Sequence, residues 1–166
     1  MNDCNLIPLL NSKLLDILHN FVHNFRSMKI SIINGPNLNL IGTREPEIYG
    51  NQSLNDFLLT LQKKYSSIQF TIYQSNVEGE IINEIQKQGF DADAIIINAG
   101  AYTHTSIAIA DALKSIATKK IIEVHISNVY ARENYRKESF IAPVSMGVIA
   151  GFGLNSYDLA VQALMV

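Results

Sequence analysis

Residues 120–126 read KIIEVHI and residues 94–98 read AIIIN. Both runs are short, rich in β-branched residues and almost continuously apolar. A strand with one face in water alternates apolar and polar side chains, whereas a strand covered on both faces has no such need. The two runs therefore predict central strands of a parallel sheet with helices packed on both of its faces.

On either side of these runs, short β-rich segments alternate with helical ones. We predict strands at 29–34, 69–74, 94–98, 120–126 and 145–150, and helices at 54–65, 77–88, 105–116 and 157–165. Ser53 with Asp56, and Ser75 with Glu78, have the spacing of a capping box, which places two helix starts. The pattern predicts an α/β fold, a doubly wound parallel sheet of five strands in flavodoxin-like order.

The composition is that of an ordinary globular domain. Of 166 residues, 48% are hydrophobic and 17% are charged, which fits a single domain with a real core. A formal net charge of -2 gives no general attraction for nucleic acid or anionic lipid, so we expect a small ligand and no nucleic-acid or membrane partner. Cys4 is the only cysteine, which excludes an internal disulfide and fits a cytoplasmic protein.

Residues 1–27 differ from the rest of the chain. Their apolar residues have helical spacing, but the basic start and cleavage site of a secretory signal are missing. We expect an N-terminal helical extension before a domain of residues 28–166; the alternative is a frayed or spuriously translated leader. His19 and His23 share a helical face with Asp16 and could bind zinc, but a solvated polar face is the favoured interpretation and we expect no metal.

Polar side chains gather where three of the predicted strands end. The loop 34–50, NGPNLNLIGTREPEIYG, follows the first strand; residues 98–104 follow the third, and residues 125–136 follow the fourth. In flavodoxin-like order these strands are neighbours, and ligands bind beyond their carboxyl ends, so the three groups should share one crevice. Glycines and prolines in the first loop predict a lid that carries Arg44 and Tyr49 over a fixed Asn37.

Glu123 is an ionisable carboxylate in a strand otherwise suited to burial, so it requires a partner. The period of two places Glu123 and His125 on one face, and His104 is predicted to begin the helix after the neighbouring strand. We expect a hydrogen bond between Glu123 and His104, which would fix the imidazole tautomer and prepare His104 as a general acid. The alternative is a structural ion pair between Glu123 and an arginine or lysine.

Tyr49 is a second candidate for proton transfer. To act as a base near neutrality, its phenol must have its pKa lowered from about 10 to near 7. Arg44 and Arg132 together could achieve this, since a neighbouring arginine lowers a pKa by roughly 1 to 3 units. Glu45 is a competing base on the same loop. The residue types alone also allow a packing role for Tyr49 and a plain turn at 34–37, and they leave the substrate open.

Five strings of the sequence together resemble the successive motifs of the type II 3-dehydroquinate dehydratases. They are INGPNLNLIGTREPEIYG, YQSNVEGEII, IIINAGAYTHTS, IEVHISNVYARENYR and GVIAGFG, in the same order and spacing over residues 28–166. The resemblance implies dehydration of 3-dehydroquinate to 3-dehydroshikimate through an enolate, in the shikimate pathway or in quinate breakdown. It also implies that no metal, Schiff base or other cofactor takes part.

The resemblance further implies catalytic roles for the matching residues. Tyr49, as tyrosinate, removes the proton next to the ketone, and Arg44 and Arg132 help to keep it ionised. Asn37 helps to stabilise the enolate oxygen through a water molecule.

The acid and the binding residues follow from the same resemblance. His104 protonates the departing hydroxyl, and Glu123 orients the imidazole of His104. The remaining matches bind substrate, either its carboxylate or its ring hydroxyls: Asn98 and the backbone amides of Ile126 and Ser127 for the carboxylate, His125 and Arg136 for the hydroxyls. Asp111 matches a position that reaches the site of the adjacent subunit, because the family assembles as a dodecamer of trimers.

Two other functions were weighed against this one. A flavodoxin-like module could hold a flavin or a nucleotide without catalysis, but the phosphate-binding patterns GxGxxG and GxxxxGK[ST] are both missing from the sequence. An inactive relative kept as a scaffold would lack a motif residue, and none is missing. The sequence therefore favours the dehydratase.

Overall fold

The computed structural model describes residues 27–42, 52–116 and 119–166. Five strands form one sheet: β1 Lys29–Asn34, β2 Gln69–Gln74, β3 Ala94–Asn98, β4 Lys120–His125 and β5 Gly147–Ala150. Every neighbouring pair is parallel, and the order is β2-β1-β3-β4-β5. The predicted flavodoxin-like order is confirmed, and it places the carboxyl ends of β1, β3 and β4 side by side.

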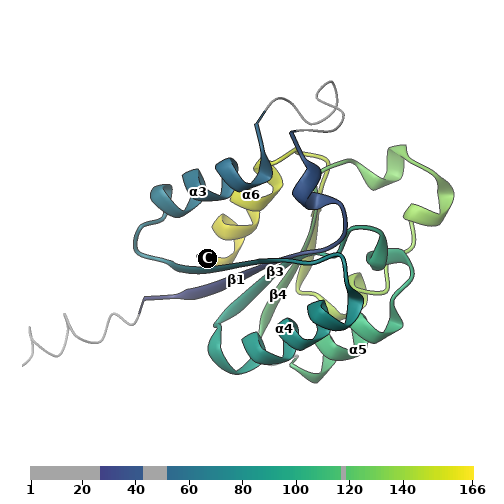
Figure 1. Ribbon diagram of the computed structural model, residues 1–166, viewed down its shortest axis with the longest axis horizontal. Coiled ribbons are helices and arrows are strands. Elements are labelled where there is room, and N and C mark those ends of the chain that lie inside the picture. The colour runs from purple at the N-terminus through teal and green to yellow at the C-terminus, as the bar shows by residue number, and fades with distance from the viewer. Residues whose placement is uncertain (1–26, 43–51, 117–118) are drawn as a thin grey trace, which may run out of the picture.

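In the described residues, four α-helices form two layers around the sheet: α3 Leu54–Lys64, α4 Glu78–Asp91, α5 Ile107–Ser115 and α6 Asn155–Leu164. Helices α3 and α6 cover one face, and α4 and α5 cover the other (Figure 1). Short 3-10 helices stand in the connecting segments: η1 Leu38–Leu40, η2 Gly100–His104, η3 Val129–Ala131, η4 Asn134–Arg136 and η5 Ala142–Val144. The chain is thus a doubly wound α/β domain.

The alternation of side chains along the central strands divides the core into two layers. Ile122 and Val124 of β4 belong to the cluster under α3 and α6, whereas Ile121 belongs to the cluster under α4 and α5. Successive strand residues point to opposite faces, so Glu123 and His125 lie on the same side as Ile121. Both are buried. A carboxylate and an imidazole are therefore placed inside the α4 and α5 side of the sheet, close to its carboxyl edge.

One of the two predicted capping boxes is confirmed. Ser53 precedes α3, and its Oγ accepts the backbone N–H of Asp56 at 3.0 Å. The box predicted from Ser75 and Glu78 is wrong, because α4 begins at Glu78 itself after an N-cap at Val77. Ser75 instead makes a local turn in which its hydroxyl accepts the N–H of Val77 and donates to the carboxylate of Glu80.

The start of α5 also differs from the prediction. The helix begins at Ile107, and the hydroxyl of Ser106 accepts the N–H of Ile109 at 2.9 Å as its cap. Residues Gly100–His104 form the separate 3-10 turn η2. His104 therefore lies at the end of a 3-10 turn, and the prediction that it begins the α-helix after β3 is wrong.

Several predictions fall outside the described residues: the helical extension with Asp16, His19 and His23, and the lid with Arg44, Glu45 and Tyr49. In the described part of the chain, no helix has the length and apolar character needed to cross a bilayer. Nor do three or more His, Cys, Asp or Glu side chains of those residues come together as metal ligands.

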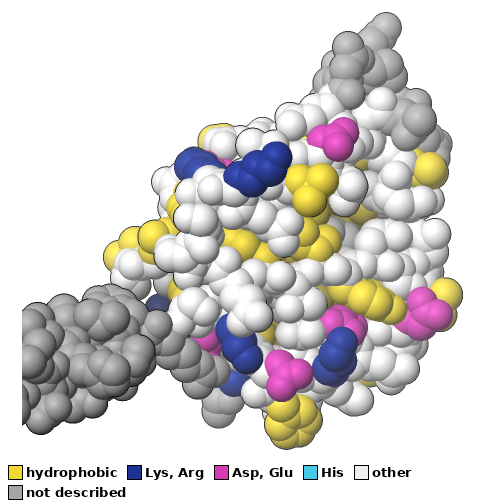
Figure 2. All heavy atoms as spheres, turned by 60° about the vertical axis from the view of Figure 1, so that its left-hand side comes forward, with side chains coloured by type: hydrophobic (Ala, Val, Ile, Leu, Met, Phe, Trp, Pro, Cys, Tyr) yellow, Lys and Arg dark blue, Asp and Glu magenta, His cyan; other side chains and the backbone are white. Residues whose placement is uncertain are grey.

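The face drawn in Figure 2 carries Lys or Arg and Asp or Glu side chains in close alternation, with apolar side chains between them. Charges of opposite sign lie near one another on this face, so it presents no extended patch of a single sign. An anionic ligand therefore finds no extended basic patch on this face (Figure 2).

Candidate active site

A cavity of about 270 Å³ lies beyond the carboxyl ends of β1, β3 and β4. Most of the predicted site residues line it: Asn37, Asn98, His104, His125, Ile126, Ser127, Arg132 and Arg136. They come from the three strand ends that the polar residues of the sequence had indicated. The prediction that these groups share one crevice is confirmed for their described members.

The remaining predicted residues are placed differently. Glu123 does not line the cavity but lies buried behind it on β4. Asp111 is exposed on α5 and is not part of the cavity wall. Arg44 and Tyr49 lie outside the described residues.

The loop after β1 is fixed against the end of β3. The N–H of Gly35 donates to the carbonyl oxygen of Asn98 at 2.7 Å, and a Cβ at position 35 would come within 2.3 Å of the carbonyl oxygen of Ala99. Only glycine tolerates this approach. Asn37 then adopts a left-handed backbone with φ 68°, which asparagine accepts more readily than most residues, and its N–H donates to Oδ1 of Asn76 at 3.0 Å.

The amide of Asn98 is held on both sides. Its Oδ1 accepts the N–H of Gly100 at 3.2 Å, and its Nδ2 donates to the hydroxyl of Tyr157 at 3.1 Å. That hydroxyl in turn donates to Oδ1 of Asn34 at 2.6 Å. Tyr157 is fully buried, and burial raises its pKa, so it acts as a neutral donor. One N–H of the Asn98 amide stays available at the cavity wall.

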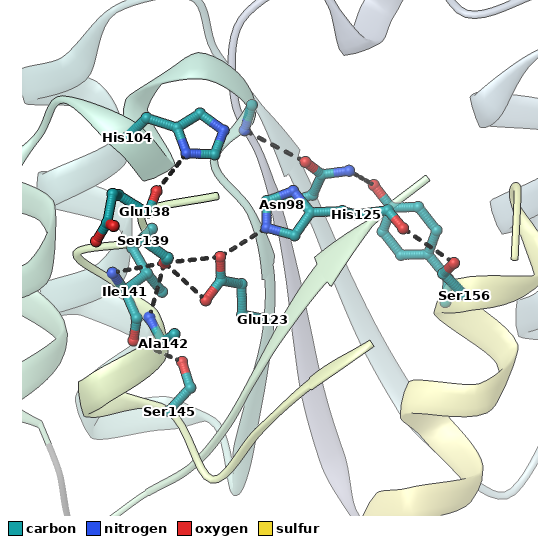
Figure 3. Close-up of polar contacts among 12 residues, drawn as sticks. Asn98, His104, Glu123, His125, Glu138, Ser139, Ile141, Ala142, Ser145 and Ser156 are labelled. Carbon is teal, nitrogen blue, oxygen red and sulfur yellow. Dashed lines mark hydrogen bonds and ion pairs between the residues drawn. The ribbon is translucent and has the colours of Figure 1, made fainter. Parts of the chain in front are cut away.

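Glu123 does not bond to His104, and this prediction is wrong. Its Oε1 accepts from Nε2 of His125 at 2.6 Å, within the same strand (Figure 3). Both carboxylate oxygens also lie near the hydroxyl of Ser139, at 2.9 and 3.0 Å. No lysine or arginine in the described ranges forms an ion pair with Glu123, so the alternative of a structural pair finds no support among them.

His104 has a different partner, because η2 carries it toward a distant segment. Its Nδ1 donates to the carbonyl oxygen of Glu138 at 2.6 Å. A carbonyl can only accept, so Nδ1 carries the hydrogen and Nε2 is left for the cavity. The rings of His104 and His125 are stacked, with centroids 6.1 Å apart and an angle of 15° between their planes. The cavity thus has two imidazoles, and within the described residues only that of His125 is paired with a carboxylate.

Two arginines complete the cavity wall. Nη1 of Arg132 donates to the hydroxyl of Ser127 at 3.2 Å, and Nε of Arg136 donates to the carboxylate of Glu133 at 2.9 Å. A hydrogen bond from its own backbone N–H and the contact with Arg136 lower the pKa of Glu133. No Asp or Glu is part of the cavity wall in the described residues. The site therefore suits an anion such as a carboxylate.

Ser139 and Tyr157 were not predicted from the sequence. Neither belongs to a polar cluster at a strand end: Tyr157 lies in an amphipathic helical pattern, and Ser139 stands alone in a loop. Their hydroxyls reach site residues only after the chain has folded. Nothing in the local pattern marks them.

The sequence of the chain matches the family model of dehydroquinase class II over residues 28–165. The chain belongs to the class II dehydroquinase family. Two similar proteins are named 3-dehydroquinate dehydratase. One from Prochlorococcus marinus subsp. pastoris is 53% identical over 141 residues, which cover 83% of this chain and 95% of the relative. One from an Exiguobacterium strain is 52% identical over 139 residues, covering 83% and 94%.

Solved structures of class II dehydroquinases agree with the fold described above. The type II dehydroquinase of Butyrivibrio crossotus superposes with a TM-score of 0.80 at 48% identity, covering 84% of this chain and 98% of that protein. The type II dehydroquinase of Propionibacterium acnes gives a TM-score of 0.78 at 38% identity, covering 83% and 96%. At these identities, the similarity extends beyond the fold class to the family.

Proposed function

We propose that this class II dehydroquinase converts 3-dehydroquinate to 3-dehydroshikimate and water. One observation carries the proposal: two histidines, two arginines and two asparagines converge on a cavity without an acidic side chain among its described residues, in a chain of this family. Such a cavity binds an anionic substrate and offers groups for proton transfer on more than one side.

The substrate carboxylate is held by the fixed amide of Asn98 and by the backbone at Ile126 and Ser127, which all line the cavity. The ring hydroxyls are contacted by His104 and Arg136. The geometry supports the binding role for His104, because Nδ1 is occupied by a carbonyl and only Nε2 is left to meet a hydroxyl. This exchanges the roles of the two histidines relative to those that the resemblance implied.

The first step removes the proton next to the ketone. Tyr49 is the base, as tyrosinate, and Arg44 and Arg132 favour its ionised form. Electrons of the broken C–H bond pass to the ketone oxygen, which becomes an enolate. Asn37 stabilises that oxygen, and the hydrogen bond that anchors its left-handed backbone to Asn76 supports the proposal because preorganised donors lower the barrier most.

The second step expels the hydroxyl, and His125 is the general acid. Glu123 fixes Nε2–H of the ring and stabilises its positive charge, as the aspartate of a catalytic triad does. Nδ1, which has no hydrogen-bond partner among the described residues, delivers the proton. The enolate electrons form the new carbon–carbon double bond as the C–O bond breaks, and the protonated hydroxyl leaves as water. Tyr49 takes up one proton and His125 gives up one, so the reaction needs no cofactor.

The assembly and the location belong to the same proposal. Asp111 is exposed and outside the cavity of its own chain, which supports a role at the site of an adjacent copy. We therefore expect a homo-oligomer, a dodecamer built from trimers, acting in the cytoplasm. Light scattering after size-exclusion chromatography measures the first expectation, and a monomer with full activity would contradict it. Fractionation of cells tests the second.

The alternative, a module that only binds a flavin or a nucleotide, has no support beyond the order of the strands. A yellow purified protein with flavin absorbance would favour it. The decisive experiment is an absorbance assay for the conjugated enone product with 3-dehydroquinate, run in the presence of EDTA. Steady formation of the enone is expected. Borohydride added with substrate should leave the rate unchanged because no lysine forms an imine.

A further inference from the structure

Ser139 lies between η4 and η5, and its hydroxyl is the centre of four contacts (Figure 3). The backbone N–H groups of Ile141 and Ala142 donate to its Oγ at 3.0 and 2.9 Å. The two carboxylate oxygens of Glu123 lie on its other side, at 2.9 and 3.0 Å. The segment is itself anchored, because the N–H of Phe140 donates to the carbonyl oxygen of Thr103 at 3.0 Å.

The direction of each hydrogen bond follows from the chemistry of the groups. A hydroxyl has one hydrogen and two lone pairs. Both lone pairs of Ser139 accept backbone N–H groups, so its single hydrogen must go to Glu123. The carboxylate of Glu123 then receives two donors, the hydroxyl of Ser139 and Nε2–H of His125. No lysine or arginine of the described residues forms an ion pair with Glu123, so this buried carboxylate depends strongly on each of its two donors.

The residue before Ser139 acts on the other imidazole of the cavity. The carbonyl oxygen of Glu138 accepts from Nδ1 of His104. Two consecutive residues of one loop therefore fix both histidines: Glu138 directly, and Ser139 through Glu123. The two imidazole rings held in this way are stacked, with their centroids 6.1 Å apart.

We infer that Ser139 is a positioning residue for the dehydration: it orients the carboxylate of Glu123 so that His125 is held as the proton donor for the departing hydroxyl. This inference rests on the proposed function. Without the hydroxyl, Glu123 can rotate away from His125, and the imidazole loses its fixed tautomer and its compensating charge. The loss of the hydroxyl slows the second step, in which the acid acts. Proton abstraction by Tyr49, the first step, is not affected.

The test compares Ser139→Ala with Ser145→Ala. Ser145 lies in the same loop, and its hydroxyl donates to the carbonyl oxygen of Ile141 at 3.0 Å without contacting Glu123. Ser139→Ala should lower kcat by at least about tenfold, part of the roughly 10²- to 10⁴-fold that a general acid contributes, with KM within about twofold. In deuterated water, the ratio of α-proton exchange to dehydration should rise for Ser139→Ala and stay at the wild-type value for Ser145→Ala.

A second pair of variants distinguishes two roles of Ser139: orienting the carboxylate of Glu123, and accepting the backbone N–H groups of the loop. Asn and Asp at position 139 can both accept the N–H groups of Ile141 and Ala142, but only Asn can also donate to Glu123. Ser139→Asn should therefore dehydrate substrate at least about tenfold faster than Ser139→Asp, whose carboxylate repels Glu123. Equal kcat for the two variants would overturn the inference, even if Ser139→Ala does not fold.

Three further outcomes test the role of Ser139. A wild-type exchange ratio in Ser139→Ala, or an equal loss of exchange and dehydration, would contradict a positioning role. The low-field N–H resonance of the His125 imidazole should shift in Ser139→Ala and not in Ser145→Ala. If the wild-type chain fails to form the enone, the proposed function itself is wrong; if it does so and Ser139→Ala matches it, only the inference about Ser139 fails.

Discussion

Glu123 and His125 are two residues apart on β4, and Oε1 of the carboxylate lies 2.6 Å from Nε2 of the imidazole. Alternate residues of a strand share a face, so this pair is built within one rigid element. The strand is buried between β3 and β5, and both side chains are buried with it. The strand therefore sets the backbone positions of both residues, and the hydroxyl of Ser139 contributes to the orientation of the carboxylate.

Because Glu123 is bonded to His125 and not to His104, substitution of the two histidines should have different kinetic effects. His125→Ala should lower kcat by roughly 10²- to 10⁴-fold, because the departing hydroxyl loses its proton donor, while α-proton exchange into solvent continues. His104→Ala should chiefly raise KM, because it removes a contact to a substrate hydroxyl. Steady-state kinetics and deuterium exchange of recovered substrate measure both effects. The opposite pattern would return the acid role to His104, as the resemblance implied.

Tyr49→Phe tests the proposed base, which is not among the described residues. The substitution keeps the ring and removes the ionisable oxygen, so kcat should fall by roughly 10²-fold or more without loss of the fold. Circular dichroism checks the fold, and Glu45→Gln is the matched control on the same loop. A near-normal rate in Tyr49→Phe, together with a slow Glu45→Gln, would move the base role to Glu45.

Tyr157→Phe tests the link between the last helix and the cavity. Without the hydroxyl, the buried side chains of Asn34 and Asn98 each lose a hydrogen-bond partner. The free energy of unfolding should fall by about 1 to 3 kcal/mol, and KM should rise because the amide of Asn98 keeps only its hydrogen bond from Gly100.

Urea unfolding and steady-state kinetics measure the two effects of Tyr157→Phe. Tyr65→Phe is the control, because the hydroxyl of Tyr65 donates to Asp158 at 2.9 Å, away from the cavity. It should change stability and leave KM unaltered. An unchanged KM in Tyr157→Phe would show that the hydroxyl serves stability alone.

Asp158 on α6 makes the stability of the domain depend on pH. Burial alone would raise the pKa of Asp158, but hydrogen bonds from Lys64 and Tyr65, the charge of Lys64 and a bond from Gln162 outweigh it and lower the pKa below the ordinary 3.8. The unfolded chain therefore binds this proton more readily than the folded one. The contribution of Asp158 to stability is complete above the ordinary value and is lost as the pH falls through the folded value.

Asp158→Asn should accordingly reduce the free energy of unfolding by about 1 to 2 kcal/mol near neutral pH and by clearly less at about pH 3. Urea titrations of both chains at the two pH values measure the difference. Asp56→Asn, at the exposed start of α3, is the matched control. An effect of Asp158→Asn that is equal at both pH values would contradict the assignment of the ion pair.

Deletion of residues 1–27 should leave kcat and KM almost unchanged. The described residues that line the cavity all follow Met28, and the family match begins at residue 28. Turnover and light scattering of the shortened chain check this prediction. A loss of activity that accompanies a smaller assembly would show that the N-terminal residues support the oligomer.

The sequence predicted the strands and the shared crevice, because both depend on local patterns. Continuous apolar runs mark buried parallel strands, and polar residues at three strand ends are brought together by the order of the sheet. The partner of Glu123 was predicted wrongly. The start of the helix after β3 was placed too early, and η2 instead takes His104 to Glu138, 34 residues away along the chain.

The contacts of Ser139 and Tyr157 could not be predicted from the sequence either. The hydroxyl of Tyr157 bonds to a residue 123 positions away, and Ser139 reaches Glu123 across 16 positions. No periodicity or motif spacing encodes such contacts, because they depend on how a loop and a helix pack against strand ends.

By itself, the sequence determined a doubly wound sheet, the three strand ends that carry the chemistry and the resemblance to one enzyme family. Only the tertiary structure decided which imidazole receives the carboxylate and which hydroxyls hold the site residues. The physical reason is the difference in range: the burial pattern of a strand repeats every two residues, whereas a hydrogen bond requires its donor and acceptor about 3 Å apart, a distance fixed only when remote segments have packed.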